Sequence, residues 1–168
     1  MRRISWILAA LSVTVLAGAL FAQNFAAEPL YGTYNLNTGF TPDPQAVSVQ
    51  AGGETDAAAL GLVDPTGGPC RGYIAVAQPD VRLNFTSGTT FPLRLYVQST
   101  SDTTLLVNMP DATWRCNDDA VGLNPVVDIP VGAVQSGQYD IWVGTYNPGT
   151  PAAATLHFTE LTSNGPTP

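Results

Sequence analysis

Oxygen-bearing side chains gather between Asp102 and Asp119, in the part of the chain best suited to hold a metal ion. Ca²⁺ takes about six to eight oxygen ligands, which carboxylates, amides and main-chain carbonyls on irregular loops supply. Adjacent carboxylates on an acidic protein would repel one another without a cation, which is the physical reason to expect one. The sequence therefore predicts a Ca²⁺ site with these ligands: Asp102, Asp111, Asn117, Asp118 and Asp119.

A second interpretation of the same residues needs no ion. The spacing does not match an EF-hand, because the regularly spaced acidic positions and the final glutamate are missing. Asp and Asn also hydrogen-bond to their own backbone in turns. Asp111 and Asn117 would then cap turns, and Asp118 and Asp119 would lie in a solvated loop.

Few residues point to catalysis. His157 is the only histidine and lies on the outward side of a predicted strand, among threonines. No GxSxG nucleophile elbow is present, and one histidine cannot form the common zinc sites. No pair of carboxylates stands out for glycoside hydrolysis. We therefore predict a protein that is not an enzyme, with a hydrolase of undetected activity as an alternative.

Aromatic residues suggest a second kind of site. Rings that project beside a carboxylate suit carbohydrate stacking or a protein contact. Alternation predicts a ligand-binding face formed by Tyr96, Asp140, Trp142 and Tyr146. The alternative is that both sheet faces are covered and that these rings pack in the core. Tyr139 begins a strand after Ser-Gly-Gln and is typical of the tyrosine corner of Greek-key sandwiches.

The only two cysteines, Cys70 and Cys116, are expected to form one disulfide that closes a loop of about 45 residues. Such a bond fits an exported chain, because exported proteins meet an oxidising environment. A metal pair or a reactive thiol is the alternative. Neither cysteine has a histidine near it in the sequence, which favours the disulfide.

The first 22 residues are typical of a secretory signal peptide. Arg2 and Arg3 precede an apolar run, and small residues follow near Ala22, where we expect cleavage. An uncleaved membrane anchor is the alternative. The predicted organisation is a signal peptide (1–22), a flexible leader (23–29), one β-sandwich domain (30–162) and a disordered tail (163–168). The predicted location is secreted or periplasmic, with no membrane contact after cleavage.

The charge of the chain limits its partners. Without Arg2 and Arg3, four arginines face 13 acidic residues, a formal net charge of −9, and there is no lysine. Nucleic acids and anionic membranes are poor partners for such a surface, whereas cations are favourable ones.

Short alternating segments fill the rest of the chain. About nine strands are expected at intervals near ten residues, with Gly, Pro, Asn and Asp between them. This pattern predicts an all-β fold, an antiparallel, jelly-roll-like β-sandwich with one disulfide. Pattern alone does not separate jelly-roll from immunoglobulin-like topology. Residues 57–62 leave room for only a turn or two of helix before Pro65.

Four motifs carry a resemblance to a known family. They are PDVRLNF, FPLRLYVQSTSDTTLLVN, PDATWRCNDD and SGQYDIWVGTY, and they span roughly residues 79–146. Together they resemble the bacterial pre-peptidase C-terminal domain, in a stand-alone secreted variant. The chain departs from the family pattern at Ala112, where a glycine commonly follows Pro-Asp, and in its disulfide, which many relatives lack.

The resemblance implies an accessory domain outside the cytoplasm. Related collagen-binding domains use calcium held by acidic loops, which would correspond here to Asp102 and to Asn117, Asp118 and Asp119. Proteolysis is not implied, because no protease domain is present. We expect an exported, Ca²⁺-stabilised binding module for an extracellular or envelope polysaccharide or protein. A self-associating structural protein of the envelope is the main alternative.

Overall fold

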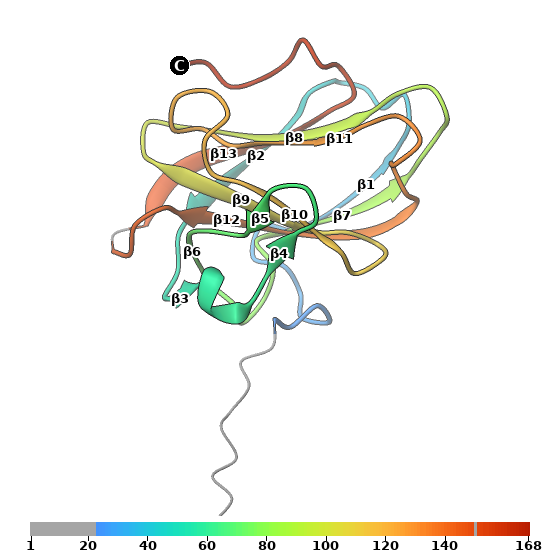
Figure 1. Cartoon of the computed structure of the whole chain (residues 1–168). Coiled ribbons are helices and arrows are strands. Elements are labelled where there is room, and N and C mark those ends of the chain that lie inside the picture. Colours follow the sequence, from blue (N-terminus) through green and yellow to red (C-terminus); the bar gives the residue numbers. More distant parts are fainter. Residues whose placement is uncertain (1–22, 150) are drawn as a thin grey trace, which may run out of the picture.

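The computed structural model describes residues 23–149 and 151–168 as two β-sheets packed face to face (Figure 1). This confirms the predicted β-sandwich. Within the described residues, nine strands have four or more residues: β1 (Thr33–Asn37), β2 (Gln45–Ala51), β7 (Val81–Thr86), β8 (Leu93–Ser99), β9 (Thr103–Asn108), β10 (Trp114–Asn117), β11 (Val126–Ile129), β12 (Gly137–Thr145) and β13 (Ala152–Thr159). The predicted signal peptide lies outside the described residues.

A covering segment, residues 53–78, holds the shorter elements. These are β3 (Thr55–Asp56), a 3₁₀ turn (Ala58–Leu60), β4 (Val63–Asp64), β5 (Gly68–Pro69) and β6 (Tyr73–Ile74). The turn confirms the predicted short helical stretch. Residues 71–77 contain only the two-residue strand β6, because Gly72 and the turn that follows Ile74 leave room for two paired residues.

The first sheet, sheet A, is built around β12. One half of β12 pairs with β7, the other half with β9, and β1 and β10 extend the sheet to give the order β1-β7-β12-β9-β10. β6 and β3 continue the sheet beside the far end of β12. The antiparallel prediction is wrong at β1, which runs parallel to β7. The chain visits the second sheet and the covering segment between these strands, and a crossover of that length permits parallel pairing.

The second sheet, sheet B, has the order β11-β8-β13-β2 and is antiparallel throughout. Alternate residues of both sheets point inward, since side chains alternate across a strand. On β7 these are Val81, Leu83 and Phe85, all almost fully buried. They meet Leu95 and Leu156 of sheet B in one apolar core.

A second, smaller core lies on the outer face of sheet A. Trp142 of β12 is fully buried there beneath the covering segment, with Leu62 and Ile74. Its indole N–H donates to the carbonyl oxygens of two residues of that segment, at 3.0 and 3.1 Å. The predicted disulfide Cys70–Cys116 is confirmed and ties the covering segment to β10.

Both ends of the described chain contact the sheets, and the C-terminal tail runs along sheet B (Figure 1). The leader places Phe25 against Trp114 and Trp142 on sheet A, with ring centroids 6.2 and 5.9 Å apart. The tail is bound to sheet B, where the backbone N–H of Thr167 donates to Oε1 of Gln98 at 2.7 Å. Contacts made by individual side chains hold both ends. Such contacts leave no periodic pattern in the sequence.

Candidate functional site

The five predicted calcium ligands lie at opposite ends of the β9–β10 hairpin. Asp111 lies in the turn that joins the two strands, whereas Asn117 ends β10 and Asp118 and Asp119 follow it. Asp102 precedes β9 at that second end. The length of the hairpin therefore separates Asp111 from the other four predicted ligands.

Asp111 and Asn117 both serve the backbone. Asp111 accepts hydrogen bonds from the N–H and hydroxyl of Thr113, at 3.0 and 2.6 Å, and from the amide of Gln135 at 2.8 Å. These bonds hold the pKa of Asp111 at about 2. The side-chain oxygen of Asn117 accepts the N–H of Val126 at 3.0 Å. The turn-capping interpretation is thus confirmed for Asp111, and the oxygen of Asn117 is already engaged.

Asp102 has an unusual environment. Its Oδ1 is buried and has no hydrogen-bond partner in the described part of the chain. Burial raises the pKa of Asp102, and the nearby carboxylates of Asp119 and Asp118 raise it further. Among residues 23–149 and 151–168, however, no three His, Cys, Asp or Glu side chains stand close enough together to hold a metal ion.

The predicted aromatic face is not one exposed surface. Tyr96 belongs to sheet B and is 6% exposed, whereas Asp140 and Trp142 point out from sheet A but are buried there. Only Tyr146, just after β12, is exposed, at 37%. The alternative of packed rings is confirmed for Trp142. Alternation placed this side chain on the correct side of β12 but could not show that the covering segment lies over it.

His157 is packed rather than exposed. Its ring stacks on Tyr96 with centroids 4.5 Å apart, and neither ring nitrogen has a hydrogen-bond partner among the described residues. Burial lowers the pKa of His157, so the ring is neutral at pH 7. A general base in a triad must be bonded to its nucleophile and to an orienting group, and His157 has neither bond here.

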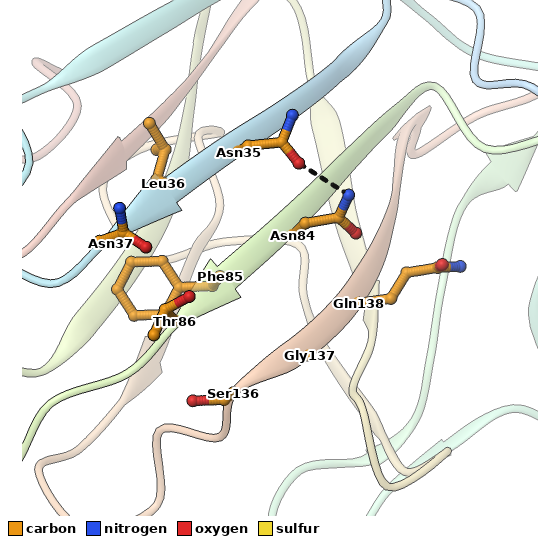
Figure 2. Close-up of a pocket in the computed structure, with 9 residues that line it drawn as sticks. All are labelled: Asn35, Leu36, Asn37, Asn84, Phe85, Thr86, Ser136, Gly137 and Gln138. Atoms are coloured by element: carbon orange, nitrogen blue, oxygen red, sulfur yellow. Dashed lines mark hydrogen bonds between the residues drawn. The ribbon is translucent and has the colours of Figure 1, made fainter.

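A line of amide side chains crosses the open part of sheet A. Asn35 of β1 pairs in register with Asn84 of β7, which pairs with Gln138 of β12. Figure 2 shows these three residues, which we call the amide row, on adjacent strands. Nδ2 of Asn84 donates to Oδ1 of Asn35 at 3.0 Å. The row lines a hollow of about 500 Å³.

A second hollow, of about 650 Å³, continues from the first across β12, because Gly137 and Gln138 line both. Phe25 and Trp114 form its apolar wall, and Asn108 adds another amide. Asn108 faces the same side as the amide row, since it pairs with Asp140. We call the two hollows together the sheet A groove.

A buried ion pair borders the groove, because Asp140 is one of the residues that line it. Nε of Arg82 lies 2.8 Å from Oδ1 of Asp140, and their side chains are 11% and 3% exposed. The amide of Gln138 donates to Oδ2 of Asp140 at 2.7 Å, so the carboxylate fixes one member of the amide row. Gln138 thus presents an oriented amide, whose oxygen accepts no hydrogen bond from the described residues.

Sequence reasoning missed the groove, although its signal is present. Asn35, Asn84 and Gln138 each occupy an outward position of an alternating strand. Amides at outward positions look like ordinary solvated residues until the strand order is known. Only the pairing of β1 with β7 and of β7 with β12 brings them into one line.

Comparison with models of known protein families and with curated proteins gives no match. The described residues contain no helix of the length and apolar character that a membrane span requires.

Proposed function

We propose that this protein is an exported, non-catalytic binding module that holds a polysaccharide in the sheet A groove. One observation carries the proposal: a row of amides from three strands runs into a hollow walled by Phe25 and Trp114. Amides both donate and accept hydrogen bonds, as sugar hydroxyls require. The apolar faces of sugar rings pack on aromatic side chains, and few polar groups then set orientation.

Export is part of the proposal. The N-terminal sequence is typical of a signal peptide, and the disulfide Cys70–Cys116 is compatible with an extracellular or periplasmic location. The resemblance to the pre-peptidase C-terminal domain remains a hypothesis, and an accessory role would agree with it. Calcium binding also remains a hypothesis, now restricted to the end of the hairpin that holds Asp102.

Titration calorimetry against soluble polysaccharides tests the proposal. Asn84→Ala together with Gln138→Ala should lower affinity about tenfold or more, because two buried hydrogen bonds to the ligand are lost. Ser48→Ala together with Gln50→Ala is the matched control, since these residues line a hollow on sheet B. Equal losses in both double variants, or no binding to any glycan, would contradict the proposal. Light scattering on the same samples tests self-association.

A further inference from the structure

The sheet A groove runs across the strands rather than along them. Its lining residues come from β1, β7, β12, β9 and β10, which are neighbours in that order. Adjacent strands lie about 4.8 Å apart, so the five strands span roughly 19 Å. Each strand interval is close to the length of one sugar unit in an extended chain. An extended ligand could therefore meet a new strand with each sugar.

The two ends of the groove differ in chemistry. The β1 end offers Asn35 and Asn37, whose side chains are exposed and polar. The β10 end offers Trp114, partly buried, against which Phe25 packs at 6.2 Å. Hydrogen bonding therefore dominates at one end and ring stacking at the other, which gives a linear ligand a preferred direction.

None of the described residues that line the groove has a cationic side chain. Arg82 is paired with the lining residue Asp140, and its Nε and Nη2 groups donate to Asp140 and to the carbonyls of Phe25 and Ala27. The described chain contains three other arginines: Arg94 pairs with Asp128, Arg115 pairs with Asp64, and Arg71 lies in the covering segment. Asp140 itself lines the groove, and its carboxylate is paired with Arg82. Carboxylate or sulfate groups would enter an acidic protein without a partner.

We propose that the sheet A groove selects a linear, uncharged polysaccharide laid across the strands and rejects chains that carry carboxylate or sulfate groups. This selectivity rests on the proposed function, because it concerns the same groove. Asn35, Asn84 and Gln138 determine it by offering hydrogen bonds without charge. The affinity should rise with chain length to about five sugar units, one for each strand, and then level off.

Calorimetry on the oxidised protein with hexasaccharides tests the selectivity. The probes are neutral β-1,4-linked hexamers of glucose, xylose and mannose, and a hexamer of galacturonate, at about 150 mM salt. We expect at least one neutral hexamer to bind at least tenfold more tightly than the galacturonate hexamer. Trp114→Ala should weaken the neutral ligand about tenfold, because a stacking surface is lost.

A change of charge provides the sharper test. Asn35→Arg places a free guanidinium at the exposed end of the amide row and should strengthen galacturonate binding about tenfold, through a charge-assisted hydrogen bond. Gln50→Arg adds the same charge on sheet B and should not change it. If the galacturonate hexamer binds the unmodified protein as tightly as the neutral hexamers do, the proposed selectivity is overturned, but the proposed glycan binding is not. Absence of binding to all probes would overturn the proposed function itself.

Discussion

The carbonyl oxygen of Phe25 accepts a hydrogen bond of 2.6 Å from Nη2 of Arg82, which joins the leader to the middle of sheet A. The same guanidinium is paired with Asp140, whose side chain is only 3% exposed. One arginine therefore compensates a buried carboxylate and also fixes the segment that walls the groove.

Removing this arginine should destabilise the fold and free the leader. Arg82→Ala leaves Asp140 buried without its partner, and we expect a loss of about 3 kcal/mol in the free energy of unfolding by urea. Amide hydrogen exchange in residues 24–30 should become faster. Arg71→Ala is the control, because Arg71 makes no ion pair in the described part of the chain, and should change stability by less than about 0.5 kcal/mol. Similar losses in both variants would contradict the assigned role.

The strands could be predicted from the sequence because each has one face in the main core. In β7, for example, apolar residues alternate with polar ones, which marks Val81, Leu83 and Phe85 as inward, and all three are buried. The hydroxyl of Tyr139 donates to the carbonyl of Gln135 at 2.7 Å and accepts its N–H at 3.0 Å, which confirms the tyrosine corner. These features depend on neighbours close in sequence or on a period of two residues.

The candidate site could not be predicted in the same way. Alternation tells which side of β12 carries Trp142, but not that residues 53–78 cover it, since that segment contains only two-residue strands. Asn35 and Gln138 lie in one line because both pair in register with Asn84 of β7, which lies between their strands. Strand order and register come from long-range packing, which one sequence does not display.

Tyr139→Phe tests the energetic value of the tyrosine corner. The substitution keeps the buried ring but leaves the N–H and carbonyl of Gln135 without their partner. We expect a loss of about 1 to 2 kcal/mol in the free energy of unfolding. Tyr34→Phe is the matched control, because the hydroxyl of Tyr34 makes no hydrogen bond within residues 23–149 and 151–168. If the two variants unfold at the same urea concentration, the corner contributes nothing.

Ala112→Gly should stabilise the protein. Ala112 has a φ of 63°, and it is the only described residue other than glycine with a positive φ. A Cβ atom costs roughly 1 kcal/mol in this left-handed conformation, and glycine avoids that cost. Ala153→Gly on β13 is the control and should destabilise, because glycine weakens a strand. Thermal unfolding of the two variants should therefore shift in opposite directions, and a lower midpoint for Ala112→Gly would contradict the prediction.

Ionisation of the buried Asp80 carboxyl group should lower the free energy of unfolding as pH rises. Asp80 is 2% exposed and accepts the N–H of Val143 at 2.7 Å, and burial raises its pKa from 3.8 to about 7. The folded protein therefore binds a proton more tightly than the unfolded chain between these pH values. The contribution of Asp80 to stability is complete below about pH 4 and is lost as pH rises through about 7.

Asp80→Asn isolates this effect. Its free energy of unfolding, relative to that of the unmodified protein, should increase between about pH 4 and pH 8, because asparagine does not ionise. Urea unfolding at several pH values measures the difference. Glu28→Gln is the control for the loss of one carboxylate, since Glu28 is exposed and makes no hydrogen bond among the described residues. A difference for Asp80→Asn that does not change with pH would place the pKa of Asp80 near its ordinary value.

Calcium should act only weakly, at the end of the hairpin that holds Asp102. Burial raises the pKa of Asp102, and the carboxylates of Asp119 and Asp118 raise it further, but among the described residues no three His, Cys, Asp or Glu side chains stand close enough together to hold an ion. We therefore expect Ca²⁺ to raise the midpoint of thermal unfolding at millimolar, not micromolar, concentration. Asp102→Asn should abolish this response and, with chelator present, should raise the midpoint by removing repulsion. Asp111→Asn is the control and should leave the calcium response unchanged, because Asp111 lies at the other end of the hairpin. If calcium does not change the midpoint of thermal unfolding of the unmodified protein, the nearby carboxylates only repel Asp102 and do not bind an ion with it.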